Sequence, residues 1–235
     1  MQQHIVTSYE EELNHLTAEV ARMGGLAEAQ VADAVNAFAR RDVALAAAIV
    51  ERDQRLDALE LEIERAAIRL IALRQPMAVD LRRTVAAMKI ASNLERCGDL
   101  AKNIAKRSLV LAETDPAGPV TRSIERMGKL VSSRLKDVLD AYTSSELAGA
   151  TAVWTRDDEV DEHYESLFRE LLTYMMGDPR TITPGAHLLF VAKNLERIGD
   201  HATNIAEIVH YEITGEELAA AARPKTDALT RAETP

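Results

Sequence analysis

The chain of 235 residues carries 38 acidic and 28 basic side chains, which gives a formal net charge of -10, and it has one cysteine. This acidic balance excludes a general nucleic-acid binder, because neutralising phosphates requires clustered Lys and Arg. A single cysteine excludes an intramolecular disulfide, and the longest uncharged apolar run near the N-terminus, residues 43–50, is too short to cross a bilayer. We therefore expect a soluble cytoplasmic protein.

Apolar residues at helical spacing predict three helices in the first half of the chain, over about 5–40, 42–74 and 78–113. Asp42 is placed to cap the second of these helices. Pro76 ends the second helix, because the residue before a proline leaves the α region, and it suits the first turn of the third helix. Gly24 weakens the first helix, and we interpret it as the site of a close helix crossing.

The clearest break in the chain is the segment Asp-Pro-Ala-Gly-Pro at 115–119, and it predicts a boundary between two domains, 1–114 and 115–215. The second half repeats the plan of the first, with helices predicted over about 120–142, 145–176 and 184–213. Thr183 is expected to cap the last helix, with Pro184 at its first position. Residues 216–235 have no sustained apolar face, and we expect a disordered tail.

An internal duplication relates the two halves. The motif Asn-Leu-Glu-Arg-x-Gly-Asp-x-Ala-x-Asn-Ile-Ala begins at Asn93 and again at Asn194, an offset of 101 residues. Upstream segments repeat at an offset of 104, so that Gly24 corresponds to Gly128. The chain is therefore a duplication of one unit of about a hundred residues.

Acidic residues recur within this duplicated unit at spacings that place them on one helical face. In each motif Glu, Asp and Asn stand at i, i+4 and i+8, and an Arg-Asp-x-x-x-Asp segment precedes each motif on the neighbouring helix. Asp57 and Glu95 are equidistant from Pro76, as are Asp53 and Asp99, so an antiparallel hairpin would bring these pairs to equal depth. In the second half the corresponding pairs are centred on the turn at 177–179.

Four carboxylates at one level repel one another, and protonation, arginine or a bound cation must relieve the repulsion. Oxygen ligands suit hard or borderline cations such as magnesium, manganese or iron. We therefore predict one metal site, mononuclear or polynuclear, in each half. The predicted ligands are Asp53, Asp57, Glu95 and Asp99 in the first half, and Asp157, Asp161, Glu196 and Asp200 in the second.

The acidic residues also fit two hypotheses other than a metal site in each half. The first is a metal-free helical scaffold, because arginines adjoin the acids and repeat with them, at Arg52, Arg96, Arg156 and Arg197. The second is a carboxylate-bridged di-iron enzyme of ferritin-like type, because Glu-x-x-His pairs occur at Glu12/His15 and Glu207/His210.

Comparison of the two halves also sorts the thiol and imidazole candidates. Cys97 corresponds to Ile198, which favours core packing over a reactive thiol. The counterparts of His201 and His163 are leucines, so these histidines could add to the second site without being essential to it.

The chain resembles the PhoU family of bacterial phosphate-signalling proteins over residues 5–213. The resemblance is carried by the doubled motif, by the segment Gln-Pro-Met-Ala-Val-Asp-Leu-Arg at 75–82 and by the two Arg-Asp-x-x-x-Asp segments. The resemblance implies an all-α fold of two tandem, pseudo-symmetric three-helix bundles, a homodimer, and metal ions bound by the eight acids named above. Leu100 departs from the motif, which usually has His there.

The resemblance also implies a function. Family members are described as negative regulators of the phosphate-starvation response, linking the phosphate ABC transporter, through its PstB-like ATPase, to a PhoR-like sensor histidine kinase. We therefore predict an adaptor without catalysis of its own, peripheral to the membrane only through its partners. The expected cofactors are divalent or iron-type metal ions: magnesium, manganese, iron or zinc.

Overall fold

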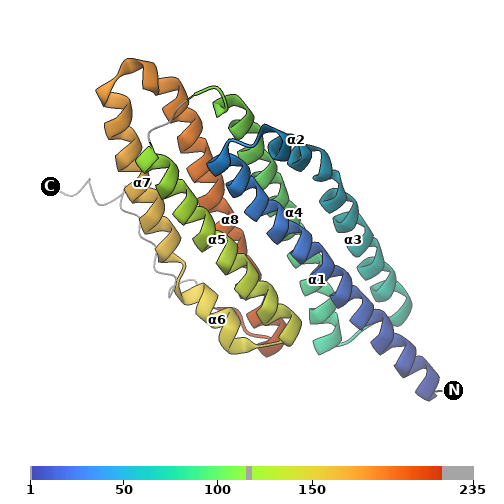
Figure 1. Ribbon diagram of the computed structural model, residues 1–235. Helices are drawn as coiled ribbons and strands as arrows, with labels where there is room; N and C mark the ends of the chain where they lie inside the picture. Colours follow the sequence, from blue (N-terminus) through green and yellow to red (C-terminus); the bar gives the residue numbers. More distant parts are fainter. Residues whose placement is uncertain (1, 115–117, 219–235) are drawn as a thin grey trace.

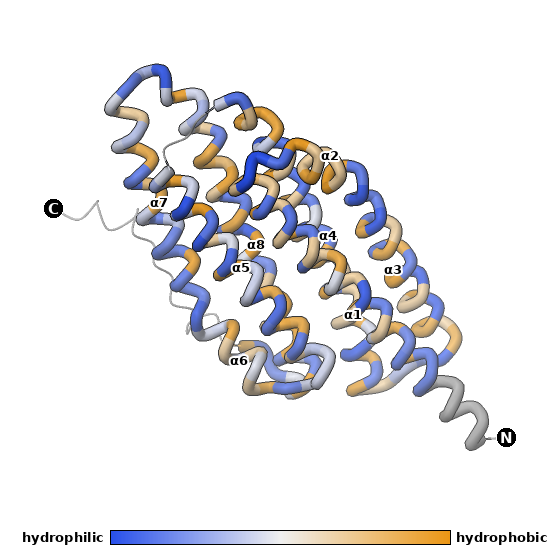
Figure 2. The backbone as a smooth tube through the Cα atoms, viewed as in Figure 1, coloured by the Kyte–Doolittle hydropathy of each residue, from blue (hydrophilic) through white to orange (hydrophobic). Residues whose placement is uncertain are grey.

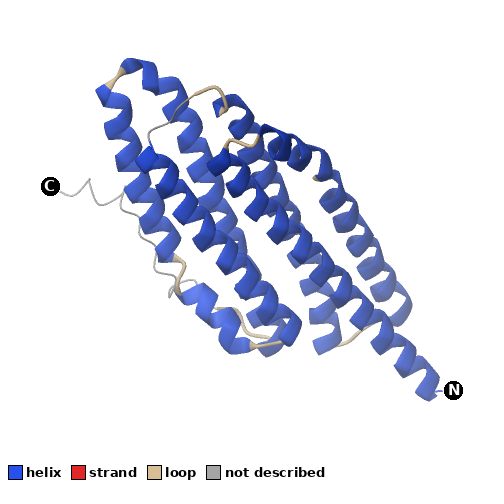
Figure 3. Cartoon of the chain, viewed as in Figure 1, coloured by secondary structure: helices blue, strands red, loops and turns tan. Residues whose placement is uncertain are grey.

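The computed structural model describes residues 2–114 and 118–218, and in these ranges helices are joined by turns and short loops, without a strand (Figure 3). The all-α class predicted from the sequence is confirmed. Of the predicted disordered tail, residues 219–235 lie outside the described residues. Among the described helices, none combines the length and the apolar character that crossing a membrane requires.

Each half of the described chain contributes three helical rods, the middle one broken (Figure 1). The first half contains α1 (Gln2–Arg40), α2 (Val43–Arg52), α3 (Gln54–Arg74) and α4 (Val79–Leu111). The second half contains α5 (Gly118–Ser144), α6 (Leu147–Thr155), α7 (Asp158–Gly177), the 3-10 turn η1 (Pro179–Thr181) and α8 (Ile182–Thr214). The structure is thus the predicted pair of three-helix bundles.

The two bundles lie side by side, with α3 at one edge of the molecule and α7 at the opposite edge (Figure 1). The bundles join through equivalent helices, because α1 packs against α5 and α4 packs against α8. Apolar and polar residues alternate along the long helices, as expected for amphipathic helices around a shared core, whereas the short helices α2 and α6 are mostly apolar (Figure 2). A continuous cluster of buried apolar side chains runs through both bundles.

The contact between α1 and α5 depends on two glycines at equivalent positions of the duplication. A Cβ atom on Gly24 would lie 2.6 Å from a methyl group of Leu139, and a Cβ atom on Gly128 would lie 2.6 Å from a methyl group of Val35. Leu139 and Val35 are themselves equivalent residues, so the same contact occurs twice. The close helix crossing predicted at Gly24 is therefore confirmed.

The middle rod of each bundle differs from the sequence prediction. The helices predicted to run unbroken over 42–74 and 145–176 are interrupted at Asp53 and at Arg156–Asp157. Asp53 lies at the first break and is buried, with 2% of its residue surface exposed, whereas Asp57 four residues later is exposed. The predicted N-cap is confirmed, because the Asp42 side chain accepts a hydrogen bond from the backbone N–H of Leu45 (2.9 Å).

The last helix of each bundle begins differently from the prediction. Gln75 does leave the α region, with φ 48°, but α4 begins only at Val79, so Pro76 lies outside its first turn. The prediction of Thr183 as the cap of α8 is wrong. Asp178 accepts a hydrogen bond from the backbone N–H of Arg180 (2.9 Å), which starts a 3-10 turn that leads directly into α8 at Ile182.

The end of α8 returns to the start of α4 and places a glutamate in the contact between the bundles. Arg82 Nε donates a hydrogen bond to the backbone carbonyl of Glu212 (3.3 Å), and Arg83 Nε lies 3.9 Å from Glu212 Oε1. Burial raises the pKa of Glu212 to about 7, and the attraction of Arg83 only partly offsets it.

This raised pKa predicts a pH-dependent stability. The folded chain binds the Glu212 proton more tightly than the unfolded chain, so the free energy of unfolding should fall as pH rises from about 4.5 to about 7. We expect Glu212→Gln to be on the order of 2 kcal/mol more stable than the wild type at pH 8 and nearly equal to it at pH 5. Urea unfolding at both pH values measures this, with exposed Glu217→Gln as the control. A gain that is the same at pH 5 and pH 8 would contradict it.

Candidate metal centre

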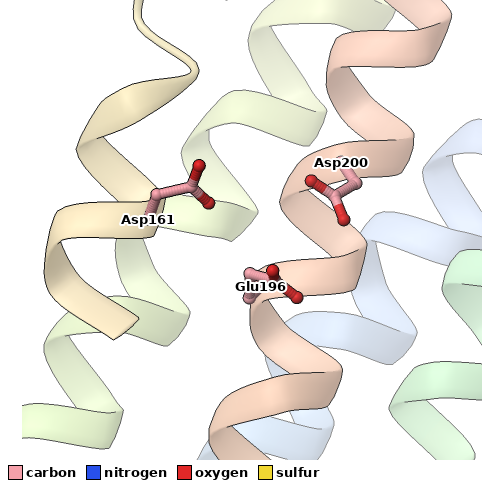
Figure 4. Close-up of side chains that lie close together, drawn as sticks. All are labelled: Asp161, Glu196 and Asp200. Atoms are coloured by element: carbon pink, nitrogen blue, oxygen red, sulfur yellow. The ribbon is translucent and has the colours of Figure 1, made fainter. Parts of the chain in front are cut away.

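Three carboxylates of the second repeat converge between α7 and α8. Each of Asp161, Glu196 and Asp200 offers an oxygen, and these oxygens all lie within 4.8 Å of one another. Asp161 projects from α7 toward Glu196 and Asp200, which stand one turn apart on α8 (Figure 4). The hairpin pairing predicted from the sequence thus brings these three predicted ligands together.

The surroundings of this triad disfavour its full ionisation. Desolvation raises the pKa of Asp200 to about 6, with further contributions from the negative charges of Glu196, Asp157 and Asp161 and a smaller opposing one from Lys193. Glu196 Oε1 accepts a hydrogen bond from Lys193 Nζ (2.7 Å), whereas Glu196 Oε2 is buried and has no hydrogen-bond partner. A buried carboxylate oxygen without a donor is costly unless a proton or a cation reaches it.

The fourth predicted ligand of the second repeat, Asp157, is not one of the acids whose oxygens lie within 4.8 Å of one another, although its charge acts on Asp200. Asp157 stands at the break between α6 and α7, is 9% exposed, and accepts a hydrogen bond from Thr203 Oγ1 (2.6 Å). The irregular residue of the break is Arg156, whereas Asp157 itself has helical φ and ψ and leads into α7; Asp157 is buried and Asp161 is half-buried. The structure therefore brings three of the four acids together and holds the fourth deeper in the bundle.

The first repeat has the same acids in a different arrangement. Asp53 is buried between α2 and α3, where it accepts hydrogen bonds from Gln30 Nε2 (2.7 Å) and from Lys102 Nζ (2.5 Å). The Lys102 ammonium also donates to Asp99 Oδ1, so it joins two of the four predicted ligands. Desolvation lowers the pKa of Lys102, but the hydrogen bonds and charges of Asp53 and Asp99 outweigh it, and the pKa stays above its usual value.

The remaining two acids of the first repeat do not complete a triad like that of the second. Asp57 is exposed on α3, and Glu95 and Asp99 are half-buried on α4 beside Arg96, whose nitrogens lie 3.4 Å from Glu95 and 3.7 Å from Asp99. Burial, followed by the charge of Asp99, raises the pKa of Glu95 to about 7. Of the four arginines considered from the sequence for a salt-bridge network, Arg96 therefore contacts two of the predicted ligands here, and Lys102 adds contacts that were not predicted.

The thiol and imidazole candidates lie outside both clusters. Cys97 is fully buried, as core packing predicts, and desolvation raises the pKa of its thiol to about 12. His163 is exposed, and His201 Nδ1 lies 2.9 Å from Asn93 Oδ1 across the contact of α8 with α4. Of the two Glu-x-x-His pairs, Glu12 forms an ion pair with Arg74 (2.6 Å), and Glu207 accepts a hydrogen bond from Trp154 Nε1 (3.2 Å). Neither pair joins the triad.

The two acidic sets differ in how well they suit a cation. The triad of the second repeat offers three clustered carboxylates, which is a donor set that fits a hard or borderline metal ion. A buried carboxylate oxygen without a hydrogen-bond donor occurs in both repeats, at Glu95 and at Glu196, so this feature does not separate them. In the first repeat an ammonium group already bridges Asp53 and Asp99. Sequence reasoning missed Lys102 and Gln30; the i, i+3 spacing of Asp99 and Lys102 was the available signal for the first.

Comparison with known proteins agrees with the duplicated fold and motif. A family model described as the PhoU domain matches residues 20–108 and again 124–209. The chain belongs to the PhoU family. The resemblance found in the sequence motifs is therefore confirmed, and the two matches fall on the two three-helix bundles.

Several PhoU relatives match almost the whole chain. A phosphate-specific transport system accessory protein PhoU homolog of Caulobacter vibrioides is 70% identical over 231 residues, which are 98% of this chain and 100% of that protein. The homolog of Rhizobium meliloti is 50% identical over 95% of this chain and 94% of its own length.

Solved PhoU structures share the fold. The crystal structure of PhoU from Pseudomonas aeruginosa has a TM-score of 0.86 and 38% identity, and covers 88% of this chain and 100% of that one. The phosphate transport system regulatory protein PhoU from Streptococcus pneumoniae has a TM-score of 0.83 and 32% identity, covering 89% and 99%.

Proposed function

We propose that this PhoU-family chain is an adaptor that negatively regulates the phosphate-starvation response. The observation that carries the proposal is the match over nearly the full length to proteins named phosphate-specific transport system accessory protein PhoU. In this proposal the chain acts in the cytoplasm, as a homodimer without catalysis of its own, and links the phosphate ABC transporter to a sensor histidine kinase.

The proposal includes metal binding, and the triad Asp161, Glu196 and Asp200 supports it for the second repeat. A magnesium, manganese or iron ion bound there would supply positive charge to a cluster whose burial and mutual repulsion disfavour ionisation. Because Asp161 belongs to α7 and the other two acids to α8, the carboxylates would tie the two helices together through the ion. The triad thus has the position of a cross-link within the second bundle.

Deletion of the gene tests the regulatory role. We expect alkaline phosphatase activity in a high-phosphate medium to rise in the deletion strain, because the kinase is no longer held inactive, and to return to the repressed level when the wild-type gene is restored. Repression that persists in the deletion strain would contradict the proposal.

The proposed partners need a separate test. The tagged full-length chain, isolated from detergent-treated cells grown at high phosphate, should carry the ATPase subunit of the phosphate transporter and the sensor kinase with it. The same isolation from cells that lack the transporter serves as the control for indirect capture. Recovery of neither partner from cells in which repression is intact would exclude the linking role.

A further inference from the structure

One position inside the duplicated motif separates the two repeats chemically. Lys102 on α4 corresponds to Thr203 on α8, and each residue donates a hydrogen bond to the buried aspartate at the helix break of its own repeat. The two hydrogen bonds have similar lengths: Lys102 Nζ lies 2.5 Å from Asp53 Oδ2, and Thr203 Oγ1 lies 2.6 Å from Asp157 Oδ1. The difference is that the first donor is a cation and the second is neutral.

The Lys102 ammonium has the position of a bridging ion. Its Nζ atom contacts Asp53, from the junction of α2 and α3, and Asp99, from α4, and its side chain is 22% exposed. It therefore connects acids of neighbouring rods, as a metal bound between those rods would, and it fills coordination positions on both carboxylates. Because the ammonium is covalently attached to the chain, its local concentration does not depend on the ions in solution. A free cation must therefore displace it to bind both acids.

The residue at the position of Gln30 also differs between the two repeats. Asp53 accepts its second hydrogen bond from the neutral amide of Gln30, so Lys102 provides the positive charge that bonds to it directly. At the equivalent place in the second repeat stands Arg134, a buried residue on α5 whose ion pair is with Glu159 (3.3 Å). The ammonium that contacts the triad is that of Lys193, which donates to Glu196 three residues further along the same helix (2.7 Å). Lys193 therefore pairs with one acid of its own helix, whereas Lys102 joins acids of two neighbouring rods.

We propose that Lys102 is the built-in cation of the first repeat, so that metal binds to the second repeat and the first is closed to it. This rests on the proposed function only in taking the second triad as a metal site. The two repeats then have different roles. The first bundle is stabilised by an internal ion pair that does not depend on metal concentration, and the second is stabilised by a metal ion whose binding does depend on it.

Exchange of the two residues tests the proposal. Manganese titrations of the chelator-treated full-length chain, followed by the electron paramagnetic resonance signal of the free ion, give the number of bound ions and their affinities. Relative to the wild type, Lys102→Thr should open an additional site in the first repeat with at least a tenfold gain in affinity there. Thr203→Lys should weaken binding in the second repeat at least 100-fold. Lys106→Thr, on the exposed side of α4, is the matched control and should change neither.

Lys102→Gln provides a second variant that keeps a hydrogen-bond donor without the charge, and circular dichroism confirms that each variant is folded. A stoichiometry in both Lys102 variants equal to that of the wild type, whatever that value is, overturns the role of Lys102. Manganese bound by Lys102→Thr but not by the wild type would support it while contradicting the metal site of the second repeat. Manganese bound equally by the wild type and Thr203→Lys would overturn it.

Discussion

Manganese added to the chelator-treated chain is expected to raise its melting temperature, and replacing Asp161 and Asp200 together by Asn is expected to abolish that rise. These residues supply two of the three clustered carboxylates. Losing a residue that only hydrogen-bonds to a metal ligand lowers metal affinity by up to about 100-fold, so losing two ligands should lower it by at least that factor. At a metal concentration 100 times the Kd, binding stabilises the wild type by about 2.7 kcal/mol. Differential scanning calorimetry with and without manganese measures both effects.

The same double variant should behave in the opposite way when metal is absent. Because the triad is repulsive and partly desolvated, neutral Asn side chains should leave the metal-free chain as stable as the wild type or more stable. This change of sign separates loss of a ligand from general damage to the fold. Glu162→Gln, an exposed acid next to Asp161, is the control and should retain the full manganese response. A double variant that keeps the wild-type rise would exclude the triad as the binding site.

A single methyl group on Gly128 is expected to destabilise the molecule by about 2–3 kcal/mol, the upper part of the range for overpacking a core. The added Cβ would lie 2.6 and 2.7 Å from the two methyl groups of Val35 and 3.2 Å from its Cβ. Valine is branched at Cβ and has little rotamer freedom in a helix, so α1 and α5 must move apart to admit the methyl group. Urea unfolding of Gly128→Ala measures the cost.

Gly25→Ala is the matched control for that measurement. It lies in α1 beside Gly24, and a Cβ there meets nothing within 4 Å, so the higher helix propensity of Ala should stabilise the chain by about 0.5–1 kcal/mol. Combining Gly128→Ala with Val35→Ala should recover part of the loss, because the smaller side chain makes room for the new methyl group. Strictly additive losses in this double variant would show that the Gly128–Val35 contact is not the source of the effect.

Local patterns were enough to predict the helices and their pairing. Helical spacing of apolar residues placed all the rods to within a few residues, and the turn at Pro76 set which acids of the hairpin stand at equal depth. The duplication predicted that Gly24 and Gly128 share one role, without showing that each contacts the other repeat. That partner depends on how the bundles dock, which spacing along a helix does not encode.

For the acidic residues, too, spacing along the chain predicted one part of the arrangement and packing determined the rest. Residue spacing alone predicted two equivalent sets of four carboxylates and hairpins that bring their helices together. The packing of the helices was needed to show that Asp53 and Asp157 are buried, that Asp161, Glu196 and Asp200 converge, and that Lys102 lies between two acids of the first set. The physical reason is that a helical pattern fixes which residues share a face, whereas packing fixes the rotation of each rod, the position of a break and the burial of a charged side chain.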